Sequence, residues 1–378
     1  MDTTPLVDFA PTARLLLLAA TIALLPLAWL WLRQRGSDTR GRLAALAALT
    51  MFLTFDLVVF GSFTRLTDSG LGCPDWPGCY GAASPFGARA DIHAAQSALP
   101  SGPVTWSKAW IEMIHRYLAM TVGALIVVMT VVSWSHRRRL PFSPWWPTLT
   151  LVWVVVQGLF GKYTVTLKLY PLVVTLHLLG GLLLLALLAA QHAAFRQRPL
   201  SLSTGLRRGA WAVLALLGVQ IALGGWVSSN YAVLACTGFP QCNGVWWPAM
   251  DFGHGFTLLR GLGEGSDGAL LSFDALVAIH MVHRLFALPA VAAMLWLAWR
   301  LWRASGAVLR RFGAGLAVLT LAQVGSGLSN VVLGWPLAAA LGHAAGAAGL
   351  VLLLTLLLAR SAPRWVVGAA PRPTAAAA

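Results

Sequence analysis

Nine mostly apolar runs, each about 20 residues long, make up most of this chain, and each has the length that an α-helix needs to cross a hydrocarbon core roughly 30 Å thick. Only 10% of the 378 residues are charged, whereas a soluble domain carries about 25%. A soluble globular enzyme and a disordered or fibrous protein are therefore excluded. The sequence predicts an all-α integral membrane protein with spans near Leu15 to Leu32, Leu43 to Phe60, Trp110 to Trp134, Pro147 to Gly161, Leu172 to Ala190, Gly209 to Val227, Phe273 to Trp299, Gly313 to Asn330 and Leu337 to Leu358.

The basic residues between these runs indicate the topology. A formal net charge of +15 is by itself typical of nucleic-acid-binding proteins. The arginines, however, lie in short clusters at the ends of apolar runs, as the positive-inside rule describes for cytoplasmic loops. We therefore expect no nucleic-acid partner, a lipid bilayer around the chain, an N-terminus outside and a C-terminus in the cytoplasm. The clusters are Arg33/Arg35/Arg40/Arg42, Arg137 to Arg139, Arg196/Arg198/Arg207/Arg208, Arg300/Arg303/Arg310/Arg311 and Arg360/Arg364/Arg372.

Both ends of the chain need an interpretation of their own. The first apolar run follows a segment with two acidic residues and one arginine, and it ends in Trp-Leu-Arg without a small-residue cleavage site. These features favour a retained span over a signal peptide. The last residues are rich in proline and alanine, so residues 363–378 are predicted to form a disordered tail.

All four cysteines fall in the two long loops that this topology places outside. They form two Cys-x5-Cys units, Cys73 with Cys79 and Cys236 with Cys242. Disulfide bonds are the expected state on an oxidising face. The alternative, a redox-active or heme-transferring thiol pair, fits the first unit better because its small ring contains two prolines. Zinc is not expected, because this spacing is not a common one for zinc ligands.

The matched cysteines are part of an internal repeat with an offset of 163 to 168 residues. Glu112-x-x-His115-Arg116 matches His280-x-x-His283-Arg284, the two Gln-x3-Gly pairs match, and His177 matches His343. Each half contains four spans, so the halves have the same orientation and are related by a pseudo-twofold axis along the membrane normal. The predicted organisation is an extra N-terminal transmembrane helix with its loop (1–40), two parallel-repeat four-helix bundles (41–200 and 201–362) and the tail (363–378).

Five of the nine histidines lie inside predicted spans, where ionisable groups are costly and are candidates for function. Helix depth separates them into pairs: His115 faces His177 in the first half, and His283 faces His343 in the second. Two histidines on neighbouring apolar helices are the ligands of a six-coordinate heme iron. A single histidine of this kind is more often a hydrogen-bonded core residue, but four in a repeat are not explained that way.

Three charged residues accompany these histidines. Arg116 and Arg284 each follow a candidate ligand directly, and a guanidinium group suits a heme propionate, although snorkelling or interhelical contacts are the alternative. Glu112 shares a helix face with His115, whereas the matching residue of the second half is His280. We expect the first half to carry out chemistry, with Glu112 accepting a proton or stabilising positive charge, and the second half to hold a permanent cofactor.

Taken together, these motifs resemble the heme A synthase family over about Leu43 to Arg360. The resemblance implies an eight-helix core with heme b in the C-terminal half and the substrate, heme O, in the N-terminal half. The implied reaction oxidises a methyl group of heme O to the formyl group of heme A by successive hydroxylations. It also implies that His283 and His343 ligate heme b, that His115 and His177 ligate the substrate heme, and that Glu112 is catalytic. The segments that carry it are Gly61 to Cys79, Glu112-Met-Ile-His115-Arg116, His177-Leu-Leu-Gly-Gly, His283-Arg284 and Gly342-His343.

Family membership carries further expectations about surroundings and partners. They are a bacterial cytoplasmic (inner) membrane with the heme sites toward the outer face, the heme O synthase (a farnesyltransferase), cytochrome oxidase assembly factors and an unidentified electron donor. The oligomeric state stays open, as do the roles of His280, His93 and His254. The extra N-terminal span and the Gly-rich loop from Gly253 to Gly268 depart from the family pattern, but neither touches a ligand position.

Two other functions compete with a heme-modifying enzyme. A diheme b-type cytochrome would use the same bis-histidine ligation for electron transfer across the membrane, but it would place one heme near each surface. Here all four candidate ligands lie in the outer half of the predicted spans. A transporter built from parallel repeats leaves the paired histidines unexplained.

Overall fold

In the computed structural model, the chain folds into α-helices joined by loops. The structure describes residues 10–362 except 197 and 266–267, and within these ranges it has no β-strand, only three isolated bridges. Nine of the described helices are long and apolar enough to cross a membrane, so the predicted all-α multi-pass fold is confirmed. The elements are α1 (Ala10–Arg33), α2 (Thr39–Leu66), α3 (Arg89–Ala98), α4 (Trp106–Ser135), α5 (Trp145–Thr166), α6 (Pro171–Arg196), α7 (Thr204–Ser229), η1 (Ala232–Leu234), α8 (Phe252–Gly255), α9 (Phe273–Arg303), α10 (Ala307–Val332) and α11 (Leu337–Arg360).

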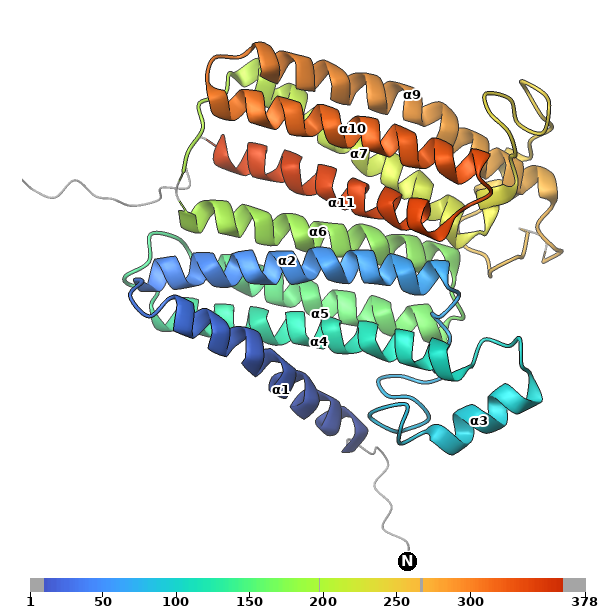
Figure 1. Ribbon diagram of the computed structural model, residues 1–378, viewed down its shortest axis with the longest axis horizontal. Helices are drawn as coiled ribbons and strands as arrows, with labels where there is room; N and C mark the ends of the chain where they lie inside the picture. The colour runs from blue at the N-terminus through green and yellow to red at the C-terminus, as the bar shows by residue number, and fades with distance from the viewer. Residues whose placement is uncertain (1–9, 197, 266–267, 363–378) are drawn as a thin grey trace, which may run out of the picture.

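The first half of the chain forms a four-helix bundle of α2, α4, α5 and α6. Helix α2 packs against α4 and α6, and α5 packs against the same two helices. Side chains such as Leu43, Leu125, Met129 and Leu188 fill its centre and are buried. Helix α1 lies outside this bundle and crosses α4 and α2 at its edge (Figure 1). Its position agrees with the predicted extra N-terminal span.

The second half repeats this arrangement with α7, α9, α10 and α11. Helix α9 packs against α7 and α10, and α11 packs against α10 and α7. Leu217, Leu297, Leu316 and Leu354 are buried in its core. The two bundles lie side by side (Figure 1). At their contact, α6 of the first bundle packs against α7 and α11 of the second, and α2 of the first bundle packs against α11.

Polar contacts join the two halves at the C-terminal ends of α2 and α7 and in the residues that follow them. The guanidinium group of Arg65 donates to the backbone carbonyl of Ser228 at 2.6 Å, and the hydroxyl of Tyr231 donates to Asp68 Oδ1 at 2.7 Å. Each contact joins residues 163 positions apart. That separation is the repeat offset itself, so matching positions of the two halves meet near the pseudo-twofold axis.

Several helices begin earlier than the apolar runs suggest. Helix α4 begins at Trp106 rather than near Trp110, because the Thr105 side chain caps it by accepting from the Lys108 backbone N–H at 3.3 Å. The apolar run places His115 about five residues into its helix, which corresponds to roughly 7 to 10 Å. In the structure it lies about 14 Å from the start of the helix at 1.5 Å per residue. His283 lies about 15 Å from the start of α9, so the two matching histidines lie at similar distances from the outer ends of their helices.

The two long loops that contain the cysteines lie at the same end of the molecule (Figure 1). The first carries the short helix α3, and the second carries η1 and α8. Both predicted disulfides are present, Cys73–Cys79 and Cys236–Cys242, and all four cysteine side chains are buried. The predicted disordered tail, 363–378, lies outside the described residues.

Candidate functional site

Each of the four predicted heme ligands packs its ring against a glycine of a neighbouring helix. A methyl group added to Gly61 on α2 would stand 2.9 Å from Cε1 of His115 on α4. The same measurement gives 3.0 Å for Gly224 and His283, 3.1 Å for Gly327 and His343, and 3.6 Å for Gly161 and His177. These glycines are related by the repeat, as the histidines are. We call them the glycine seats, since the absent side chain leaves room for the imidazole.

The structure brings the histidines together in the predicted pairs. His115 on α4 and His177 on α6 belong to the first bundle, and each ring packs against a glycine of the helix next to its own. His283 on α9 and His343 on α11 form the corresponding pair of the second bundle. Within the described ranges no group of three or more His, Cys, Asp or Glu side chains could hold a free metal ion. Two imidazoles on facing helices suit a heme, which takes two axial protein ligands.

The two pairs differ in what their Nδ1 atoms contact. In the second bundle, Gln220 Nε2 lies 3.2 Å from Nδ1 of His283, and Ser326 Oγ lies 3.0 Å from Nδ1 of His343. In the first bundle, Nδ1 of His115 and of His177 is buried and has no hydrogen-bond partner among the described residues. The candidate ligands of the second bundle therefore have partners for Nδ1, and those of the first bundle have none among the described residues.

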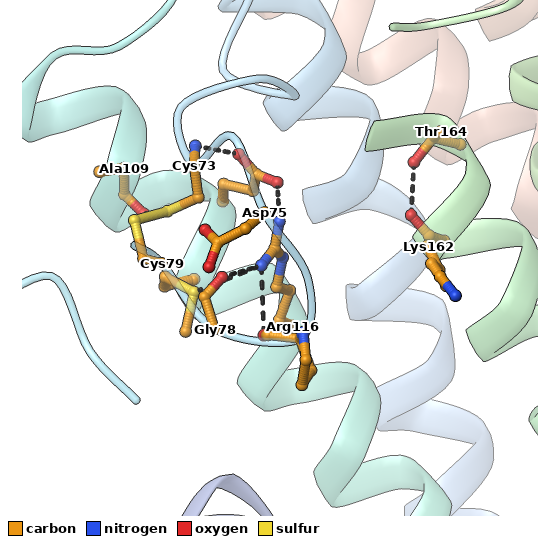
Figure 2. A network of polar contacts seen from close by, with 12 residues as sticks. Cys73, Asp75, Gly78, Cys79, Ala109, Arg116, Lys162 and Thr164 are labelled. Carbon is orange, nitrogen blue, oxygen red and sulfur yellow. Dashed lines mark hydrogen bonds and ion pairs between the residues drawn. A yellow bond between two sulfur atoms is a disulfide. The ribbon is translucent and has the colours of Figure 1, made fainter. Parts of the chain in front are cut away.

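Glu112 is buried on α4, one turn before His115, as predicted from the spacing. Its carboxylate accepts a hydrogen bond from the Cys73 backbone N–H at 2.8 Å and forms an ion pair with Arg116. Arg116 also donates to the backbone carbonyls of Pro77 and Gly78 in the same loop. Figure 2 shows the loop of the first disulfide folded around the guanidinium group. The carboxylate is thus fixed between a helix and a disulfide-closed loop.

The second bundle keeps the arginine but not the carboxylate. Arg284 donates to the backbone carbonyls of Cys236 at 2.6 Å and Gly238 at 3.0 Å, so both arginines hold the disulfide loop of their own half. The predicted propionate role of Arg116 and Arg284 stays a prediction. His280, at the position of Glu112, is buried and its Nδ1 lies 2.9 Å from the Ala232 carbonyl oxygen.

The histidines predicted in the outer loops lie away from both pairs. The ring of His93 on α3 stacks on Trp106, with ring centroids 6.0 Å apart. Nδ1 of His254 lies 2.6 Å from Oδ2 of Asp251. Hydrogen bonds from the backbone and the ring of His254 hold the pKa of Asp251 below its usual value. These contacts describe local loop structure.

The sequence interpretation missed three features of the site. Gly61, Gly161 and Gly327 were noted only as parts of longer motifs, without a role beside the histidines. Gly224 and the Nδ1 partners Gln220 and Ser326 were not singled out. Asp56, a carboxylate within α2, was also overlooked. It lines a shallow pocket of about 320 Å³ together with Phe60, Phe63 and Leu341. The sequence alone could have identified Asp56, because an acidic residue inside a predicted span is a functional candidate by default.

Comparison with known proteins places the chain in a family. The family model COX15-CtaA, described as cytochrome oxidase assembly protein, matches residues 44–356. A heme A synthase of Shewanella oneidensis is 38% identical over 321 residues, which cover 84% of this chain and 95% of the relative. Heme A synthases of Shouchella clausii and Caulobacter sp. are each 28% identical, over 55% and 58% of this chain and 65% and 70% of the relatives. The chain therefore belongs to the COX15-CtaA family of cytochrome oxidase assembly proteins.

Proposed function

We propose that this chain is a heme A synthase, an oxidoreductase that converts a methyl group of heme O into the formyl group of heme A for cytochrome oxidase. The family match and the similar heme A synthases support the reaction. The two bis-histidine pairs support the handling of two hemes, because each pair offers the two axial ligands that one heme takes.

The single observation that carries the proposal is that Glu112 occurs in one half only. Residues 41–200 form the substrate half, in which His115 and His177 hold the iron of heme O. Residues 201–362 form the cofactor half, in which His283 and His343 hold heme b. Heme b, when bound, supplies one-electron redox chemistry. Only the substrate half places a carboxylate one helical turn from an axial ligand.

Glu112 acts on the substrate through its fixed charge and position. Arg116 and the Cys73 amide hold the carboxylate on the helix face that carries His115. A preorganised negative group of this kind stabilises positive charge that develops on the substrate carbon, and it is able to take up a proton as the methyl group is oxidised. The surrounding apolar helices exclude water, which strengthens that electrostatic effect.

The proposed setting is a bacterial cytoplasmic membrane with the N-terminus outside, the C-terminus inside and the heme sites toward the outer face. The arginine clusters support this orientation through the positive-inside rule. The partners that the reaction requires are the heme O synthase that supplies the substrate, the assembly factors that receive the product and an electron donor.

The test is the heme content of cells that carry Glu112→Gln or Glu112→Ala. Both variants are expected to retain heme b and to accumulate unconverted heme O, measured by extraction and chromatography of the hemes. Asp274→Asn is the matched control, because Asp274 is an exposed carboxylate in the first turn of α9. Normal heme A output from the Glu112 variants would overturn the catalytic assignment. Purified wild-type protein that contains heme b but never O-type or A-type heme would instead favour a diheme cytochrome.

A further inference from the structure

The contacts of the four Nδ1 atoms separate a permanent heme site from an exchanging one. We infer that Gln220 and Ser326 are positioning residues that hold the two heme b ligands in place, and that Leu57 and Phe160, at the matching positions of the first half, leave the substrate-heme ligands free to release the product. This inference rests on the proposed function, because it takes the second half as the heme b half.

Ser326 offers the clearest anchoring geometry. An imidazole that binds iron through Nε2 carries its proton on Nδ1, and that N–H needs an acceptor. Ser326 Oγ lies 3.0 Å from Nδ1 of His343 and itself donates to the Gln323 carbonyl at 3.2 Å. The chain of donors and acceptors is therefore complete from the ring to the backbone of α10. It fixes the ring rotation and makes Nε2 a stronger ligand.

Gln220 performs the same task for His283 from α7. Its side-chain amide lies 3.2 Å from Nδ1, and its Oε1 is buried without a partner among the described residues. The same amide nitrogen, Nε2 of Gln220, donates to the backbone carbonyl of His283 at 3.2 Å, so the amide bridges the ring and the backbone of His283 and limits the rotation of the ring.

The glycine seats fix the register that identifies the matching residues. Gln220 stands four residues before Gly224, and Leu57 stands four residues before Gly61. In the same way Ser326 directly precedes Gly327, and Phe160 directly precedes Gly161. Leu57 and Phe160 carry no donor or acceptor on their side chains. The buried Nδ1 atoms of the first half accordingly lack a partner in the described part of the chain.

This difference suits the two tasks. A resident cofactor works only while it stays bound, whereas a substrate site must release each product heme before the next turnover. Removing a hydrogen-bond partner of a metal-bound histidine typically weakens metal affinity by roughly 10- to 100-fold. Because Leu57 and Phe160 offer no hydrogen bond to the ring nitrogens, the first half releases its heme faster than the second half does.

The inference is tested on the full-length purified protein by the rate at which heme passes to apomyoglobin. Ser326→Ala and Gln220→Leu are each expected to release heme b about 10- to 100-fold faster than wild type and to shift its midpoint potential. Ser326→Thr keeps the hydroxyl and should restore both values. Ser329→Ala is the matched control, because Ser329 lies one turn further along α10 and its hydroxyl bonds only to the Gly325 carbonyl.

The reverse change is made in the first half. Phe160→Ser is expected to slow the release of O- and A-type heme from the purified protein by a similar factor and to lower heme A output. Heme b release and midpoint potential that stay unchanged in both Ser326→Ala and Gln220→Leu would overturn the inference. Failure of the proposed function has a different signature, since wild-type protein would then yield no heme A whatever the release rates.

Discussion

The two bundles of this molecule share one frame and differ in the groups that surround it. Each bundle carries two histidines at matching depths, seats each ring on a glycine and uses an arginine to hold a disulfide-closed loop. Only the first bundle adds a buried carboxylate, and only the second supplies partners for the ring nitrogens. Duplication therefore provides two similar bis-histidine sites, and a few substitutions on the shared frame give the two sites different surroundings.

The glycine seats show the same division on a smaller scale. In the second bundle both seats are tight, at 3.0 and 3.1 Å from the ring, whereas the first bundle has one tight seat at Gly61 and a looser one, 3.6 Å, at Gly161. The looser contact belongs to His177, whose Nδ1 is also unpartnered among the described residues. His177 is thus the least constrained of the four rings, both in its glycine contact and in its ring nitrogen.

Replacing the proposed axial ligands has the largest expected effect and directly tests the different roles of the two bundles. His283→Ala or His343→Ala should abolish the low-spin heme b spectrum of the purified protein, because a bis-histidine heme loses one of its two ligands. His115→Ala should leave that spectrum in place and abolish heme A output. Absorption spectra of the three variants decide the matter. If His283→Ala keeps the heme b spectrum, the roles of the halves must be exchanged.

The glycine seats provide a graded test of the same comparison. Gly327→Ala places a methyl group 3.1 Å from the His343 ring, and overpacking of this kind costs about 1 to 3 kcal/mol, so heme b content should fall several-fold. Gly161→Ala meets its histidine at 3.6 Å, an ordinary contact, and should leave heme A output close to wild type. Pyridine hemochrome spectra and heme chromatography measure both. Equal losses in the two variants would remove the distinction between tight and loose seats.

The sequence predicted the helices and the histidine pairs, because both follow from the lengths of the apolar runs and from the internal repeat. The run lengths predicted nine spans, and the repeat identified His283 as the counterpart of His115 and His343 as the counterpart of His177. The helix starts were less well predicted, because the cap at Thr105 lies in a polar segment that hydropathy does not mark as helical. The ligand depth in α4 was therefore underestimated.

The surroundings of the ligands escaped prediction for a different physical reason. Whether Gln220 reaches His283 depends on how α7 is rotated against α9, and no spacing within one helix reports that rotation. The partners of Arg116 depend on the path of a loop closed by Cys73–Cys79, whose shape comes from tertiary contacts. The sequence therefore did not predict that Arg116 donates to loop carbonyls.

The disulfide loops test whether the asymmetry extends outside the bundles. Replacing Cys73 and Cys79 by serine should lower heme A output, because the Cys73 backbone N–H holds Glu112 at 2.8 Å. The same change at Cys236 and Cys242 should cost similar stability, about 2 kcal/mol for a ring of this size, yet leave conversion by the remaining folded protein unchanged. Heme A formed per folded protein separates the two effects. Equal conversion by both double variants would show that the first loop does not position the carboxylate.

The polar contacts that join the two halves are expected to have the smallest effect, and to affect only the stability of the protein. Tyr231→Phe removes the hydroxyl that donates to Asp68 at 2.7 Å, while the stacking of Arg65 over the ring at 3.9 Å is kept. A single exposed hydrogen bond contributes about 1 kcal/mol, so the free energy of unfolding should fall by that amount. Thermal unfolding in detergent measures it, and the heme b spectrum and heme A output serve as controls. The hydroxyl itself contacts neither a glycine seat nor a ring-nitrogen partner, although Gly61 and Gly224 lie one helical turn before Arg65 and Ser228. A change in heme release by Tyr231→Phe would therefore mean that these contacts between the halves are coupled to the heme sites through α2 and α7.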